Sequence, residues 1–239
     1  MNALSTIEGS AFRGENYGAS VPLVRSFLAV DRTVNTWGKL PRDVKDPWSG
    51  AHLIDAERYR KNMVQNFIDN VLVPPENCRW TGFKEIRYDL SPEVLEQIWD
   101  AYLREFPKSF IIFNTRCVED VARSGWWRNW DRAEVDKLVN KLDEAFEKFQ
   151  KANPTRSVVV DYDDYTADVM ALKPIFDMIG EPFDEDGLKE RFQARLTHGY
   201  SPSRDQALNA EPENQTPEKE EVEKEEVGKE EAAKEMSQG

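Results

Sequence analysis

Two short apolar runs constrain the fold of this chain more than any other feature. Residues 110–113 read FIIF and residues 157–160 read SVVV, and both are too short to form a buried helix. Such runs are typical of strands buried on both faces, as in a parallel sheet. Apolar residues at helical spacing surround them, most clearly over residues 135–149. The alternation predicts an α/β fold, a three-layer sandwich in which helices cover both faces of a parallel sheet.

Other segments extend this alternation. An extended segment at 12–17 precedes a helix that begins near Ala19, and a second helical stripe at 59–72 stops at Pro74 and Pro75. Residues 81–88, TGFKEIRY, read as extended. Ser91 suits a helix N-cap and Pro92 suits the first helical position after it. Two further helices are expected at about 169–178 and 188–196.

The C-terminal end differs in composition from the rest. Residues 211–239 contain eleven Glu and four Lys, which is −7 of the chain's net charge of −13. Such a segment buries too little apolar surface to fold alone, so we expect an α/β domain at 1–200 and an acidic disordered tail at 201–239. The tail serves as a solvating segment or as a binding site for a protein partner.

Composition excludes several classes of function. The net charge argues against sequence-independent binding of nucleic acid, which depends on Lys and Arg. Two Cys and two His are too few for a disulfide framework or a zinc cluster. We expect no membrane span and a cytoplasmic location, because no apolar run approaches ~20 residues and the first residues lack the pattern of a signal peptide. The GxxxxGK[ST] loop and the GxSxG turn are both absent from the sequence.

Candidate binding residues follow the first apolar run. Ligands of open parallel sheets bind at the carboxyl ends of strands, where Arg116 leaves the strand. Ser124 and Arg128 are four residues apart and would share one face of the following helix. Two guanidinium groups and a hydroxyl suit a phosphate, because Arg donates paired, charge-assisted hydrogen bonds. The alternative is ordinary surface arginines paired with Glu119 or Asp120.

Two other segments carry candidate catalytic groups. Lys84 lies near a predicted strand end, where a lysine can balance negative charge developing on a bridging oxygen, and Arg87 could hold an anion. Glu15 is a candidate general base, provided that its surroundings desolvate the carboxylate. The plainer interpretation of Lys84 and Arg87 is alternating charge on an edge strand, and that of Glu15 is a solvated glutamate in a turn.

Three carboxylates follow the second apolar run in the segment DYDDY, residues 161–165. Oxygen ligands suit Mg²⁺ or Ca²⁺, but the segment lacks the glycine and the distal glutamate of a calcium loop. Helix capping and surface charge are the favoured roles.

In this order and spacing, the segments FRGENYGAS, GFKEIRY, PKSFIIFNTRCVEDVARSGWWR and VVVDYDDYTAD resemble sulfotransferases that use 3′-phosphoadenosine 5′-phosphosulfate (PAPS). The resemblance spans residues 1–200 and is closest to the bacterial and tyrosylprotein branches. It implies a P-loop NTPase-like fold without a metal. The roles it implies are catalytic base for Glu15 or its neighbour Asn16, sulfuryl transfer for Lys84, and nucleotide binding for Arg116, Ser124, Arg128 and Tyr162.

The resemblance also implies a first strand and an RSGTT-type loop that bind the 5′-phosphosulfate, and neither is in this sequence. We therefore expect an N-terminally truncated version of the fold. The expected function is transfer of a sulfuryl group from PAPS to a hydroxyl of a carbohydrate, lipid or similar small molecule. The alternative is a non-catalytic nucleotide-binding or scaffolding protein that works through its acidic tail. A kinase of related architecture is less favoured, because the GK[ST] loop is absent.

Overall fold

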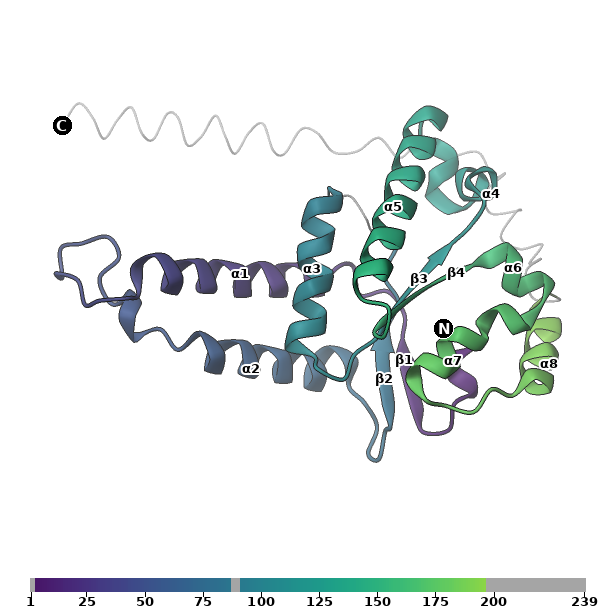
Figure 1. The fold of residues 1–239 in the computed structure, drawn as a ribbon, viewed down its shortest axis with the longest axis horizontal. Helices are drawn as coiled ribbons and strands as arrows, with labels where there is room; N and C mark the ends of the chain where they lie inside the picture. The colour runs from purple at the N-terminus through teal and green to yellow at the C-terminus, as the bar shows by residue number, and fades with distance from the viewer. Residues whose placement is uncertain (1–2, 87–90, 197–239) are drawn as a thin grey trace, which may run out of the picture. The chain divides into compact units, whose positions relative to one another are not determined.

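The structure, a computed structural model, describes residues 3–86 and 91–196 (Figure 1). Residues 1–194 form one compact unit, and a second unit spans residues 195–239. Arg87 and the acidic tail at 201–239 lie outside the described residues. None of the described helices combines the length and the apolar character needed to cross a membrane.

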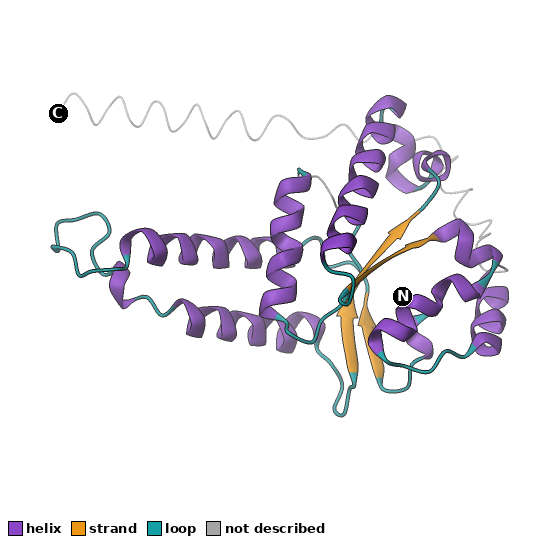
Figure 2. Cartoon of the chain, viewed as in Figure 1, coloured by secondary structure: helices purple, strands orange, loops and turns teal. Residues whose placement is uncertain are grey.

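Four parallel strands occur in the described residues (Figure 2). β1 (Ser10–Arg13) pairs with β2 (Trp80–Phe83), and β3 (Ile111–Thr115) pairs with β4 (Ser157–Asp161). The expectation of one continuous sheet is wrong for these residues, since the four strands form two sheets of two. The pairs are linked by side-chain packing instead, and the ring of Trp80 lies 5.9 Å from that of Phe110.

Helices surround the strands in the order predicted. The helices of the first half are α1 (Ser20–Trp37), α2 (Ala56–Phe67) and α3 (Pro92–Glu105), with single turns η1 (Leu4–Thr6) and η2 (Ala51–Leu53) and a π-helical turn η3 (Ile68–Leu72). The second half contains α4 (Val118–Arg123), η4 (Gly125–Asn129), α5 (Arg132–Ala152), α6 (Tyr162–Ala167), η5 (Val169–Leu172), α7 (Lys173–Ile179) and α8 (Glu185–Leu196).

The pair β3–β4 has helices on both faces, as the α/β pattern predicts. Phe113 and Val159 pack with α3 and α5 on one face, where the rings of Phe113 and Phe146 stack at 4.5 Å. Val158 and Val160 pack on the other face with η5, α7 and Leu188 of α8. The first run is less buried than expected, because only Phe113 in β3 is fully buried. A two-stranded sheet leaves one edge of each strand without a strand neighbour.

The predicted start of α3 at Pro92 is confirmed, but two helix ends differ in detail from expectation. Ser91 occupies the N-cap position of α3 but accepts no backbone hydrogen bond. Its hydroxyl bonds the carboxylate of Glu93 instead, and this bond lowers the pKa of Glu93. The stripe predicted for 59–72 is α2 followed by η3, which ends at Val73 with a left-handed φ of 44°. The guanidinium of Arg13 donates to the carbonyls of Leu72 and Val73 and so anchors this helix end to β1.

Arg156 connects β4 to the elements before β3. Its guanidinium donates to the carbonyls of Leu103 at 2.8 Å, Phe106 at 2.9 Å and Ser109 at 2.9–3.0 Å. These carbonyls lie at and beyond the end of α3, where helical partners are lacking. One partly buried side chain therefore satisfies three carbonyl groups and fixes the approach of the chain to β3.

Candidate functional site

The carboxyl ends of β3 and β4 lie side by side, because Thr115 is in register with Asp161. The Thr115 hydroxyl donates to the Asp161 carboxylate at 2.7 Å. The residue that follows each strand is a predicted binding residue, Arg116 after β3 and Tyr162 after β4. The Arg116 guanidinium lies 4.6 Å from the centroid of the Tyr162 ring. The structure therefore brings together two of the four predicted nucleotide-binding residues through adjacent parallel strands.

The contacts of Arg116 leave part of its guanidinium unsatisfied. Its Nη2 donates to Asp120 at 3.2 Å, so the pairing considered from sequence does occur. Its Nε is buried and has no hydrogen-bond partner among the described residues. A buried donor without an acceptor is costly, and an exception of this kind calls for an explanation. An acceptor oxygen from a ligand would satisfy it.

Ser124 and Arg128 do not share a helical face, contrary to expectation. α4 ends at Arg123, Ser124 is extended with a ψ of 144°, and Arg128 belongs to the separate turn η4. The Ser124 hydroxyl donates to the Val121 carbonyl at 2.9 Å, and Arg128 Nε donates to the Gly125 carbonyl at 2.9 Å. The extended Ser124 ends the helix, and Gly125, with a left-handed φ of 49°, follows it at the start of η4. In the part of the chain that the structure describes, no hydrogen bond or ion pair joins either side chain to Arg116.

The acidic segment 161–165 caps a helix, as favoured from sequence. The Asp161 carboxylate accepts from the backbone N–H groups of Asp163 and Asp164 and so begins α6. Asp163 also accepts from the N–H of Cys117 at 3.4 Å. Within residues 3–86 and 91–196, no group of three or more His, Cys, Asp or Glu side chains is arranged to hold a metal ion.

One acidic residue of this region was missed from the sequence. Asp143 lies on α5 and is half-buried, and its pKa is raised to about 6 by burial and by the negative charges of Asp161 and Glu147. Perturbed carboxyl groups cluster at functional sites, although structural ones occur too. A sequence signal did exist, since Asp143 lies four residues after Val139 and three before Phe146, at the margin of the apolar stripe of α5.

The ends of β1 and β2 bring together the two predicted catalytic residues. The backbone N–H of Lys84 donates to the Arg13 carbonyl at 3.2 Å, which continues the strand pairing by one residue. Two residues after Arg13, the Glu15 carboxylate lies 3.3 Å from the Lys84 ammonium group. Both side chains remain partly accessible, Lys84 at 52% and Glu15 at 28%. The pair can therefore meet a hydroxyl that approaches from solvent.

The turn after Glu15 holds a second unsatisfied donor. Asn16 Oδ1 accepts from the N–H of Ala19 at 3.1 Å, whereas its Nδ2 is buried without a partner in the described part of the chain. Tyr17 and Gly18 both have left-handed φ values, 59° and 70°. The N–H of Gly18 donates to Glu85 at 2.6 Å, which ties this turn to the segment after β2.

Among the buried side-chain nitrogen and oxygen atoms of the described residues, only Asn16 Nδ2 and Arg116 Nε lack a hydrogen-bond partner. Both are N–H donors, and each lies in a segment that the sequence singled out for chemistry. Structures rarely leave such donors unpaired, so each marks a place where an acceptor oxygen would be stabilised. Comparison with protein-family models, with curated proteins and with solved structures found no significant match for this chain.

Proposed function

We propose that this chain is a sulfotransferase that transfers a sulfuryl group from PAPS to a hydroxyl of a carbohydrate, lipid or similar small molecule. One observation carries the proposal. At the carboxyl ends of two adjacent parallel strands, Arg116 stacks on Tyr162 and retains a buried donor without a partner. An aromatic face and an unsatisfied guanidinium together suit a nucleotide that carries a phosphate.

In this proposal, Arg116 binds the 3′-phosphate and Tyr162 lies against the nucleotide. The phosphate oxygen accepts from Arg116 Nε and competes with Asp120 for Nη2. Ser124 and Arg128 are proposed to bind the same phosphate. For this role each must leave the carbonyl of its own turn to which it now donates.

The proposed transfer uses the pair at the ends of β1 and β2. Glu15 removes the proton of the acceptor hydroxyl, and the acceptor oxygen forms a bond to sulfur. The bond between sulfur and the bridging oxygen of the 5′-phosphate breaks, and Lys84 stabilises the charge that develops on this oxygen. The products are a sulfate ester and 3′,5′-ADP, and the proton remains on Glu15. The 3.3 Å pairing supports the assignment, because it brings the two groups to one place.

In the proposed three-layer, P-loop-like fold, both strand pairs belong to one parallel sheet. The packing of Trp80 on Phe110 supports a single sheet, since these residues begin β2 and directly precede β3.

The proposal is tested by calorimetric titration of the full chain with 3′,5′-ADP and with 5′-AMP. We expect Arg116→Ala to weaken binding of 3′,5′-ADP at least tenfold, which is about 1.4 kcal/mol, because a charge-assisted contact is lost. Binding of 5′-AMP should not change, since this ligand lacks the 3′-phosphate. Arg132→Ala is the matched control, because Arg132 is an exposed arginine in the same region that pairs with Glu119 and Asp136.

Equal binding of 3′,5′-ADP by the wild type and Arg116→Ala would contradict the proposal, as would no binding by the wild type. In either case the alternative is the scaffolding protein, for which deletion of residues 211–239 should abolish capture of a protein partner. The enzyme proposal expects the same deletion to leave nucleotide binding unchanged.

A further inference from the structure

The loop between α1 and α2, residues 38–55, exposes an unusual number of large apolar side chains. Leu40, Val44 and Leu53 are 73%, 86% and 77% exposed, and Trp48 and Ile54 are also exposed. These five account for half of the ten exposed large apolar side chains in the described residues. Scattered apolar residues on a surface need no explanation, whereas a cluster marks an interaction site. We name residues 38–55 the tip loop.

Contacts within the tip loop and with Trp37 at the end of α1 hold the loop in place. The rings of Trp37 and Trp48 stack at 5.3 Å with an interplanar angle of 7°, and the Arg42 guanidinium lies 4.8 Å from the Trp37 ring. Arg42 also pairs with Asp46 at 3.0 Å. Asp43 accepts from the N–H of Lys45 at 2.9 Å, and Asp46 accepts from that of Trp48 at 2.8 Å. The aliphatic side chains are therefore exposed by a structured loop.

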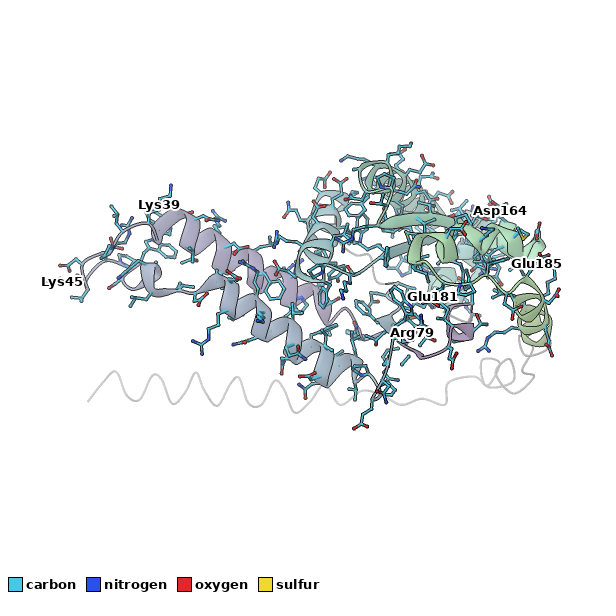
Figure 3. All side chains as sticks on the ribbon, turned by 60° about the horizontal axis from the view of Figure 1, so that its bottom comes forward. Lys39, Lys45, Arg79, Asp164, Glu181 and Glu185 are labelled. Atoms are coloured by element: carbon cyan, nitrogen blue, oxygen red, sulfur yellow. The ribbon has the colours of Figure 1, made fainter. Side chains whose placement is uncertain are left out.

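The tip loop is neutral, whereas the rest of the protein is acidic. Lys39, Arg42 and Lys45 balance Asp43, Asp46 and Asp55, so residues 38–55 carry no net charge and the other residues carry all of the −13. Lys39 and Lys45 are exposed and form no ion pair in the part of the chain that the structure describes. Figure 3 shows both lysines at the end of the α1–α2 hairpin.

We infer that the tip loop docks on a lipid surface that contains anionic headgroups. Leu40, Val44 and Leu53 enter the boundary between headgroups and acyl chains, while Lys39 and Lys45 contact the phosphates. Trp48 is a residue type enriched at such interfaces, because its ring is amphipathic.

Two observations favour lipid over a protein partner. The apolar side chains sit on a loop that closes a helical hairpin, where they can insert between lipids without a complementary groove. The lysines lie among the apolar side chains, so the loop can contact headgroup phosphates and acyl chains at the same time. The tip loop also lacks the net negative charge of the rest of the chain, so an anionic surface repels it less than it repels the acidic remainder.

The test is flotation of the full chain with phosphatidylcholine vesicles containing 30% phosphatidylglycerol, and with pure phosphatidylcholine vesicles, each at 50 and 500 mM salt. We expect binding to the mixed vesicles and a loss of at least tenfold in partition coefficient for Leu40→Ser/Val44→Ser/Leu53→Ser. Lys39→Gln/Lys45→Gln should remove the preference for anionic vesicles, and high salt should do the same. Both variants change exposed side chains, so their thermal unfolding should match that of the wild type.

The matched control is Val71→Ser/Met170→Ser, which changes two exposed apolar residues outside the tip loop and should bind as the wild type does. Failure of the wild type to float with either vesicle would overturn the inference. Equal flotation of the wild type and the triple serine variant would overturn it too. Self-association of the wild type that the triple variant loses, without flotation, would identify a second copy as the occupant instead. None of these outcomes depends on nucleotide binding, so the inference stands or falls separately from the proposed function.

Discussion

The ammonium group of Lys84 lies 3.3 Å from the carboxylate of Glu15, although 69 residues separate them in the chain. The parallel pairing of β1 with β2 brings them together, because Arg13 is in register with Phe83 and each catalytic candidate follows within two residues. A strand pair with this register places one acidic and one basic group at the carboxyl ends of its two strands. This is the arrangement that proton removal and charge stabilisation at neighbouring oxygens require.

Glu15→Gln should lower turnover at least 100-fold without weakening binding of 3′,5′-ADP, because the amide cannot accept the hydroxyl proton. Lys84→Ala should have a similar effect on turnover. The measurement is transfer of labelled sulfate from PAPS to octyl glucoside, a carbohydrate hydroxyl acceptor, with calorimetry on the same samples. Lys61→Ala is the control for loss of a lysine on an exposed helix face. Wild-type turnover by Glu15→Gln would exclude it as the base and direct attention to Asn16.

Tyr162→Ala should weaken binding of both 3′,5′-ADP and 5′-AMP about three- to tenfold, because the aromatic face against the nucleotide and the guanidinium is lost. Tyr162→Phe should bind both ligands as the wild type does, since the ring alone makes the contact with Arg116. Calorimetry distinguishes the two variants. An equal loss in Tyr162→Phe and Tyr162→Ala would show that the hydroxyl, not the ring, is the binding group.

Arg156→Ala should lower the free energy of unfolding by about 2–4 kcal/mol, because three carbonyls at the end of α3 lose a charged donor. Arg156→Lys should recover only part of this loss, since an ammonium group lacks the planar fork that reaches all three. Urea unfolding followed by circular dichroism measures the free energy of unfolding of both variants. Lys151→Ala, which removes an exposed ion pair with Glu147, should change little. Equal stability of Arg156→Ala and the wild type would refute the structural role.

Asp143→Asn should stabilise the protein at neutral pH. The pKa of Asp143 in the folded protein is about 6, above the ordinary value of 3.8, so folding favours its protonated form. Its contribution to stability is therefore lost as pH rises from about 4 to about 6, and the neutral amide escapes this loss. At pH 7.5 we expect a gain of about 1 kcal/mol, a value reduced for the partial exposure of the carboxyl.

Urea unfolding of Asp143→Asn and the wild type at pH 4 and pH 7.5 measures this effect. The difference in the free energy of unfolding between the variant and the wild type should nearly vanish at pH 4. Asp100→Asn, at an exposed position on α3, controls for the loss of one negative charge. A gain of equal size at both pH values would show that packing, rather than titration, explains the stabilisation.

Local pattern predicted much of the fold. Apolar runs and helical stripes depend on spacing along the chain, so the strands at β3 and β4 and the helices α3 and α5 were predictable from residues alone. The capping role of Asp161 was also predictable, because a short polar side chain directly before a helix has few other uses. Glu15 and Lys84 were candidates from the residues, the resemblance favoured the catalytic role over the plainer one, and the structure added their contact.

Only the tertiary structure decided which groups face one another. Strand partners and registers are long-range, so the sequence could not show that the strands form two separate pairs or that Arg13 satisfies a helix end 59 residues away. The end of α4 at Arg123, which separates Ser124 from Arg128, depends on the extended backbone of Ser124 and the left-handed φ of Gly125, and helical spacing reveals neither. Desolvation likewise depends on what packs around a side chain, so the raised pKa of Asp143 and the unpartnered donors of Asn16 and Arg116 appear only once distant segments pack around them.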